Sequence, residues 1–386
     1  MPLLILVLSL AVFAQGTSEF MLAGLLLPIS AELGVTPAVA GTLTSAFAVG
    51  MVIGAPAMAL IGARWSPRRA LIALLSLFLL SHVVGAVTPT FEVLLITRVI
   101  SALANAGFLA VALATVGRLV LPDRTTRAVA TLLAGTTLAT IIGVPAGALL
   151  ATLLGWRATF WGVVLLCIPA LIALLRDRSL RQAAAAPGIR IRDELSELRR
   201  RPVLGSVVLA VLVNSATFGV FTFLGVLGAD AGIQAPLIPL LLAGFGVGAF
   251  AGVTATGRWA PGRERAWITA GTAMLMCAWA AFALLVASPI ALPLLAVLCG
   301  ALSFAVGSAL IGRIVREAGG APVLGGAYAT VALNLGAFSG PLIAGIVYER
   351  SEAAAVPWTA VIITATAVMI TVWALAPALN QTRSGR

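Results

Sequence analysis

One acidic side chain lies within a long apolar stretch of the sequence. Glu19 stands in GTSEF, residues 16–20, with apolar runs on both sides. A carboxylate at the centre of a membrane-spanning helix costs about 2.5–3.5 kcal/mol on insertion scales, so such a residue is functional by default. A buried carboxyl group holds its proton more tightly than one in water, and a nearby guanidinium loosens it. Glu19 is therefore a candidate for taking up and releasing protons. The alternative is a static ion pair that only orients helices.

Arg98 is a basic residue well inside another apolar stretch. Glu19 lies eight residues from the C-terminal end of the first stretch, and Arg98 lies seven from the N-terminal end of the fourth, which would run in the opposite direction. With a rise of about 1.5 Å per residue, the two side chains lie at similar depth and are able to pair. We predict that both take part in proton coupling. A fixed lock between helices is the alternative for Arg98.

Amide and aromatic side chains in similar stretches are candidates for contacts with a small molecule. Asn105 lies seven residues after Arg98, so the two share a helix face. Amides inside a membrane also bond neighbouring helices, and a single Phe more often packs against lipid or protein. The predicted substrate-binding residues are Asn105, Phe108, Asn214, Phe218, Tyr328 and Asn334.

Small residues and a proline gather in the fifth apolar stretch. Gly143, Pro145 and Gly147 fall within five residues of one another. Small residues let helices approach closely, and proline bends a helix axis. We predict a gating role for these three residues, either as a hinge or as a seal. Simple helix packing is the alternative.

The sequence gives no support for enzyme chemistry, a metal or another cofactor. It has no His/Glu cluster, no phosphate-binding loop of the GxxxxGK form and no Cys-His pair. The three cysteines, Cys167, Cys277 and Cys299, are scattered along the sequence. We therefore expect each of them to act as a small buried apolar side chain. The single histidine, His82, would suit a proton relay, but packing is its expected role. Without a site for ATP, uphill work would have to draw on an ion gradient.

Composition indicates a membrane protein. The 386 residues are 61% hydrophobic and 10% charged, whereas soluble domains carry about 25% charged residues. Each apolar stretch is long enough for a helix to cross a bilayer, and strict alternation typical of barrel strands is absent from the sequence. We predict an all-α membrane protein with an uncleaved first helix and twelve transmembrane helices. Their expected ranges are 4–27, 38–60, 70–88, 91–116, 128–151, 158–175, 203–227, 236–257, 266–287, 290–311, 324–347 and 357–377.

The basic residues predict the orientation of these helices. All 24 are Arg, and 21 fall in connections or tails on one side if the helices alternate in direction. Arg enrichment marks the cytoplasmic side, so both termini are expected in the cytoplasm. The net charge of +11 therefore reflects membrane topology, and we expect no nucleic-acid partner.

The two halves of the chain resemble each other. WSPRR at 65–69 matches WAPGR at 259–263, and GRLV at 117–120 matches GRIV at 312–315. GVP at 143–145 matches SGP at 339–341, so three pairs share an offset of 194 to 196 residues. This repetition predicts two six-helix bundles, 1–175 and 203–386, joined by a cytoplasmic linker at 176–202 with a surface helix near 192–200.

Five segments together resemble the twelve-helix drug:proton antiporters of the major facilitator superfamily, in particular the actinobacterial chloramphenicol exporters. The segments are LLLP at 25–28, RVISALANAGFLAVA at 98–112, GTTLATIIGVPAGALL at 135–150, GWRATFW at 155–161 and GAYATVALNLGAFSGP at 326–341. One departure is the loop GARWSPRR at 62–69, which lacks the acidic residue usual in that family. A gating contact of the family is therefore absent or made differently.

The resemblance implies efflux of a small drug, chloramphenicol, driven by proton entry across the bacterial inner membrane. Glu19 would match the embedded acid of the family's first helix, Arg98 the basic residue of its fourth, and Pro145 its antiporter signature. If Glu19 and Arg98 pair, no spare negative charge remains, which favours a neutral substrate over a cation. We expect a monomer in the lipid bilayer. A metabolite exporter for a sugar or nucleoside is the alternative, followed by a membrane enzyme or receptor.

Overall fold

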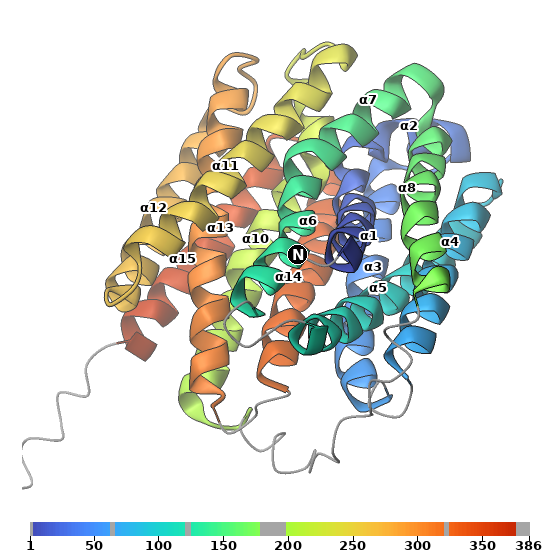
Figure 1. Cartoon of the computed structure of the whole chain (residues 1–386). Coiled ribbons are helices and arrows are strands. Elements are labelled where there is room, and N and C mark those ends of the chain that lie inside the picture. The colour runs from blue at the N-terminus through green and yellow to red at the C-terminus, as the bar shows by residue number, and fades with distance from the viewer. Residues whose placement is uncertain (1–2, 62–65, 120–124, 178–197, 320–323, 376–386) are drawn as a thin grey trace, which may run out of the picture.

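The computed structural model describes residues 3–61, 66–119, 125–177, 198–319 and 324–375. Every regular element in these ranges is helical, and the long helices pack side by side (Figure 1). A helix satisfies its own backbone hydrogen bonds, which lipid requires of any spanning segment. The elements before residue 178 are α1 (Leu3–Phe20), η1 (Met21–Gly24), α2 (Leu26–Leu33), α3 (Pro37–Ile61), α4 (Pro67–Val87), α5 (Phe91–Leu119), α6 (Thr125–Leu138), η4 (Ala139–Gly143), α7 (Val144–Leu154) and α8 (Trp156–Arg176). Those after residue 200 are α10 (Arg201–Asp230), η6 (Ala235–Leu237), α11 (Ile238–Trp259), α12 (Glu264–Leu284), α13 (Ala291–Glu317), α14 (Leu324–Arg350) and α15 (Ala355–Leu375).

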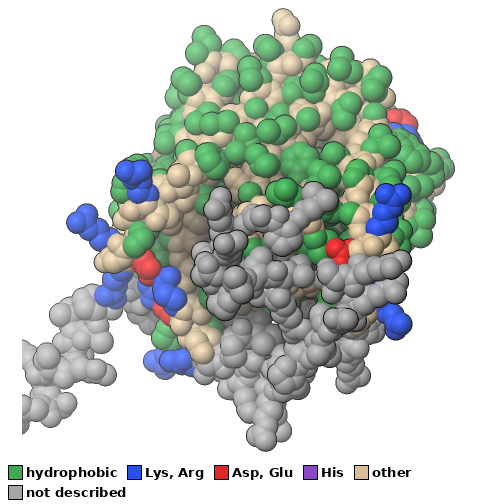
Figure 2. All heavy atoms as spheres, viewed as in Figure 1, with side chains coloured by type: hydrophobic (Ala, Val, Ile, Leu, Met, Phe, Trp, Pro, Cys, Tyr) green, Lys and Arg blue, Asp and Glu red, His purple; other side chains and the backbone are tan. Residues whose placement is uncertain are grey.

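Eleven spans in the described residues are long and apolar enough to cross a membrane. Helix α15 adds a shorter apolar stretch, Ala355–Thr371, as the twelfth. Large apolar side chains cover the outside, and Leu80, Leu154 and Ile290 are 58%, 71% and 80% exposed. Figure 2 shows this apolar cover on one face. The predicted all-α membrane fold is thus confirmed, with span boundaries that move by a few residues.

The first span differs from its predicted range of 4–27. Helix α1 ends at Phe20, a 3-10 turn follows, and α2 continues to Leu33. Pro28 has no backbone N–H, so a continuous helix through it would lose a hydrogen bond. The helix is interrupted just before this residue. Gly34 then ends α2 in the left-handed conformation, with φ of 67°.

The fifth span contains a π-helical turn that the sequence did not predict. Element η4 covers Ala139–Gly143, and the N–H of Val144 donates to the carbonyl of Ala139, five residues back. The next residue in this pattern is Pro145, which has no N–H to give to the carbonyl of Thr140. The turn accommodates the proline and leaves the Thr140 carbonyl without that backbone partner.

The spans form two six-span bundles, α1–α8 and α10–α15. In the first, α5 packs against α3 and α4, and α1 packs against α6 and α8. In the second, α11 packs against α13 and α10 against α14. Glycine allows the closest of these contacts. A Cβ added at Gly248 would overlap the Val297 carbonyl, and one added at Gly300 would overlap the Phe245 carbonyl.

We expect Gly300→Leu to destabilise the protein by at least about 1–3 kcal/mol, because the added side chain would push α13 from α11. Thermal unfolding of the purified protein in detergent measures this effect. Gly307→Leu is the matched control on the same helix, since a Cβ there meets no atom within 4 Å. Equal unfolding temperatures for the two variants would contradict this account of the contact.

Charged side chains lie near the helix ends at both ends of the molecule. At one end, Arg68 Nε donates to a carbonyl oxygen at the end of α8 at 2.9 Å, and Arg313 Nε lies 2.8 Å from Glu317 Oε1. At the other end, Arg157 forms an ion pair with Glu32. We call these the Arg-rich end and the Glu32 end.

The two bundles contact each other toward the Glu32 end. Thr36 Oγ1 donates to Glu349 Oε1 at 2.7 Å, which joins the start of α3 to the end of α14. Ser45 Oγ donates to the Phe338 carbonyl oxygen at 2.9 Å between the same helices. Helix α11 packs against α7 and η4, and η1 packs against α10. These contacts close the seam between the bundles at that end.

The predicted linker at 176–202 lies mostly outside the described residues. Helix α8 continues to Arg176 and α10 begins at Arg201, so these helices reach both ends of the predicted linker. Residues 192–197 of the predicted surface helix near 192–200 lie outside the described residues. Residues 198–200 form a turn, so the prediction is wrong for this last part.

Candidate functional site

Glu19 lies in the last turn of α1, beside α5. Its side chain is partly exposed, whereas its neighbour Ser18 is fully buried. The Nδ2 atom of Asn105 lies 3.5 Å from Glu19 Oε2, which is a long hydrogen bond. The sequence placed Asn105 on the same helix face as Arg98, and the structure brings its amide to Glu19. A carboxyl group with this partial exposure is able to exchange a proton with water.

Arg98 is buried, with 1% of its surface exposed, and it binds Ser18 rather than Glu19. Its two terminal nitrogens donate to Ser18 Oγ at 2.8 Å and to the Ser18 carbonyl oxygen at 2.7 Å. The guanidinium also lies over the ring of Phe47, 4.4 Å from its centroid. The ion pairs of the described residues do not include Glu19 with Arg98. The two charges lie at similar depth as expected, but the direct pair is not formed.

Arg98 binds Ser18 because Ser18 lies close to the C-terminal end of α1. The last four carbonyls of an α-helix lack partners in the same helix, and α1 ends two residues after Ser18. A guanidinium at this position caps the carbonyl and interacts favourably with the helix dipole. Arg98 therefore gains two hydrogen bonds at Ser18 without moving to Glu19.

His82 is connected to this site, which the sequence did not predict. Its Nε2 lies 2.7 Å from Ser18 Oγ, and its Nδ1 lies 2.8 Å from the Phe78 carbonyl oxygen. It is also packed among aromatic rings, as expected. The ring of Phe78 is 4.2 Å away and that of Phe160 5.7 Å away, centroid to centroid. The signal available in the sequence was a lone ionisable ring inside an apolar span.

Gln15 is a second residue that the sequence analysis missed. It lies one helical turn before Glu19 and is 1% exposed. Neither the oxygen nor the nitrogen of its amide has a hydrogen-bond partner in the structure. An unpartnered buried amide costs about 1–3 kcal/mol, so Gln15 is a candidate hydrogen-bonding residue one turn from Glu19. A Gln four residues before the acid of the first span was the available signal.

The predicted substrate-binding residues of the second bundle have neighbours inside the protein. Asn214 donates its amide to the Leu333 carbonyl of α14, and Asn334 donates to the Thr330 carbonyl of its own helix at 2.9 Å. The Asn214 bond is of the helix-to-helix kind that the sequence left as the alternative, whereas the Asn334 bond stays within one helix. Tyr328 is buried, at 7% exposed. Their contact with a substrate stays a prediction.

Aromatic rings from both bundles meet beside Glu19. Phe20 of α1 lies 5.9 Å from Phe218 of α10, and Phe221 lies 4.7 Å from Phe245 of α11, measured between centroids. The space among them is about 10 Å³, room for about one water molecule. Phe108 is fully buried within the first bundle. Phe218 thus lies at the seam between bundles and Phe108 does not line this space.

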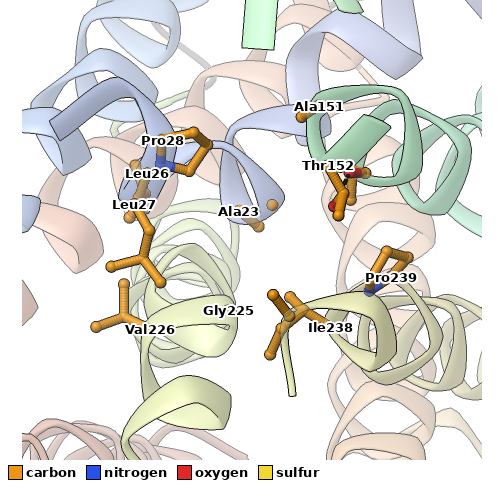
Figure 3. A pocket seen from close by; sticks show the side chains of 13 residues that line it. Ala23, Leu26, Leu27, Pro28, Ala151, Thr152, Gly225, Val226, Ile238 and Pro239 are labelled. Carbon is orange, nitrogen blue, oxygen red and sulfur yellow. Dashed lines mark hydrogen bonds between the residues drawn. The ribbon is translucent and has the colours of Figure 1, made fainter. Parts of the chain in front are cut away.

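A larger cavity of about 190 Å³ lies in the seam toward the Glu32 end (Figure 3). Leu26, Leu27 and Pro28 lie on one side and Ile238 and Pro239 on the other. Its lining is almost entirely apolar, and Thr152 contributes a hydroxyl. Both bundles therefore contribute walls to this space.

Two of the three predicted gating residues, Gly143 and Gly147, pack closely against other helices. A Cβ added at Gly143 would overlap the hydroxyl of Thr17, and one at Gly147 would lie 2.9 Å from the Thr159 methyl group. Pro145 is the second residue after the π-helical turn. The two glycines are thus closely packed, and a gating role for the three residues stays a prediction.

Cysteines and metal sites add nothing to this centre. Cys167 and Cys299 are buried as predicted, but Cys277 is exposed because its side of α12 faces away from the bundle. In the described parts of the chain, groups of three or more His, Cys, Asp or Glu able to hold a metal are absent.

Twelve spans in two bundles, whose described residues carry charge at one site inside the spans and near the helix ends, define a multi-pass membrane transporter for small molecules. The chain belongs to the Major Facilitator Superfamily, which its residues 8–321 match. It is therefore a transporter and not an enzyme.

Relatives cover nearly the whole chain. A chloramphenicol resistance protein of Streptomyces lividans is 47% identical over 374 residues, 96% of this chain and 95% of that protein. A chloramphenicol efflux pump of Mycobacterium tuberculosis is 31% identical over 369 residues, 90% and 86% of the two chains. The inner membrane transport protein YdhP of Escherichia coli is 30% identical over 89% of this chain and 88% of its own.

Solved structures share the fold at much lower identity. The nucleoside transporter NupG superimposes with a TM-score of 0.78 at 11% identity, over 96% of this chain and 99% of that one. A bacterial homologue of the human lysosomal transporter Spinster, inward-facing and occupied, gives 0.76 at 15% identity over 96% of each chain.

Proposed function

We propose that this protein exports a small neutral drug, chloramphenicol, from the bacterial cytoplasm in exchange for protons. The observation that carries this proposal is the 47% identity, over 96% of the chain, to a chloramphenicol resistance protein. The 31% identical efflux pump supports the same substrate. The protein would act as a monomer in the inner membrane.

Proton exchange is assigned to Glu19, supported by Arg98. Glu19 is partly exposed and therefore has access to water, whereas Arg98 is sealed inside the bundle. The chain offers a single route for coupling within the described spans, since its other acidic residues lie near helix ends. Protonation of Glu19 would alternate with drug binding as the bundles change their relative position.

Charge balance supports a neutral substrate. The described interior of the spans holds one acid and one base, which cancel although they do not form a direct pair. A cationic drug would need a second acid, which this site lacks in the described residues. The contacts to the drug are proposed from polar and aromatic side chains inside the spans of both bundles. They are Gln15, Asn105, Phe108, Asn214, Phe218, Tyr328 and Asn334.

The orientation follows from the distribution of Arg. If the Arg-rich end faces the cytoplasm, both termini and the linker at 176–202 lie there, with the bundles at 1–175 and 203–386. The bundles touch toward the Glu32 end, so the conformation described would open to the cytoplasm. Gly143, Pro145 and Gly147 are proposed to seal the opposite, outer side.

Flux of labelled chloramphenicol in proteoliposomes tests the proposal. With a proton gradient directed against drug movement, we expect uptake well above that of empty liposomes, and its loss when a protonophore collapses the gradient. A nucleoside and a sugar serve as comparison substrates. Gradient-driven movement of either of these, with none of chloramphenicol, would overturn the proposed function.

A further inference from the structure

The hydrogen bonds around Ser18 form a chain with a fixed direction. The Phe78 carbonyl only accepts, so His82 Nδ1, 2.8 Å away, carries a hydrogen and donates it. In the neutral ring Nε2 then has a lone pair, and the Ser18 hydroxyl donates to it at 2.7 Å. The Ser18 oxygen is left to accept from Arg98 at 2.8 Å. Each donor in the chain therefore determines the orientation of the next.

The imidazole ring has little freedom to leave this chain. It is 1% exposed and lies between the rings of Phe78 and Phe160. Helix α4 packs against α5 and α8. The charged groups near the ring are Arg98 on α5 and Glu19 on α1, while α8 presents Phe160. An ordered ring in this setting holds the Ser18 hydroxyl in one orientation.

Arg98 has two sites within reach, and it occupies the neutral one. Ser18 and Glu19 are adjacent on α1, and buried guanidinium groups are normally paired with a carboxylate. Here Arg98 binds Ser18 twice, and its Nε remains without a partner. The bonds to Ser18 therefore compete with an ion pair to Glu19.

We propose that Ser18 and His82 anchor Arg98 away from Glu19, which leaves the carboxyl group free for its proton. His82 is thus a positioning residue that acts through Ser18 and Arg98. The proposal rests on the proposed function for its role in transport, but the hydrogen-bond chain is testable without transport.

Transport measured against pH tests the role of the anchor. His82→Phe keeps an aromatic ring but removes the acceptor, and Ser18→Ala removes the hydroxyl. Arg98 would then move to Glu19 and favour its ionised form, so the pH of half-maximal chloramphenicol efflux should fall by about one unit in both variants. His82→Gln retains an acceptor and should lie closer to wild type. Ser30→Ala, a buried serine that bonds only within α2, should not shift.

Because the protein has a single histidine, the chain of hydrogen bonds around Ser18 can be tested directly. Protein labelled with ¹⁵N-histidine and purified with a histidine-free tag should show one pair of ring-nitrogen signals, those of the Nδ1–H form. Ser18→Ala should shift the Nε2 signal, and Ser30→Ala should leave it unchanged.

The outcomes separate the two proposals. Absence of chloramphenicol flux in wild type would contradict the proposed function alone, because the ring-nitrogen signals still report the chain. Flux with an unchanged pH midpoint in His82→Phe and Ser18→Ala would overturn the anchor. An Nε2–H form, or an Nε2 signal unaffected by Ser18→Ala, would overturn it as well.

Discussion

Glu19→Gln is expected to abolish proton-driven chloramphenicol efflux, a loss of at least about tenfold. Glutamine resembles the protonated acid in shape and charge, but it releases no proton. The variant should therefore still exchange labelled for unlabelled drug across the membrane without a gradient. Proteoliposome flux with and without a pH gradient measures both properties on the same preparation.

Glu92→Gln is the matched control for this experiment. Glu92 lies in the first turn of α5 and is exposed, so the same chemical change should leave efflux at the wild-type rate. Gradient-driven efflux that persisted in Glu19→Gln would show that another group carries the proton. Loss of drug exchange as well would assign Glu19 to drug binding.

Gly246→Leu should reduce transport at least about tenfold, since it blocks a close contact between the bundles. A Cβ at Gly246 of α11 would overlap the Thr140 carbonyl oxygen of η4. The leucine would hold α11 away from the fifth span, at a cost typical of overpacking, about 1–3 kcal/mol or more. The bundles would then fail to close toward the Glu32 end, and alternation between two states would stop.

Gly257→Leu on the same helix separates this effect from general damage to α11. A Cβ at Gly257 meets no atom within 4 Å, so its transport should stay near wild type. Labelling of a cysteine introduced at Ala38, in a background without the native cysteines, reports opening at the Glu32 end. Gly246→Leu should increase that labelling. Normal transport in Gly246→Leu would show that the contact at Thr140 is dispensable.

Most of the fold was predictable because lipid imposes one solution on each apolar stretch. The twelve spans followed from length and hydropathy alone. The break after Phe20 and the π-helical turn did not, because they depend on how Pro28 and Pro145 are accommodated against neighbouring helices. Proline marks such positions in a sequence, but it does not determine which irregular turn forms.

The candidate site was predictable only in its principal residues. Glu19, Arg98 and Asn105 were identifiable because charged and amide groups are costly in a membrane. Their partners were not, since the contact of α4 with α1 through His82 and Ser18 joins residues 64 positions apart. The binding of Arg98 to a carbonyl at the end of α1 also required the position of that helix end.

The Thr140 carbonyl has a consequence for how the bundles separate. Pro145 has no backbone N–H to give it, and Gly246 of α11 packs so closely against it in the closed seam that an added Cβ would overlap the oxygen. Once the two helices part, that oxygen would face an apolar gap at a penalty of about 1–3 kcal/mol unless a water molecule reaches it. Hydration of the seam is thus a condition for opening it, and a dry seam stays shut.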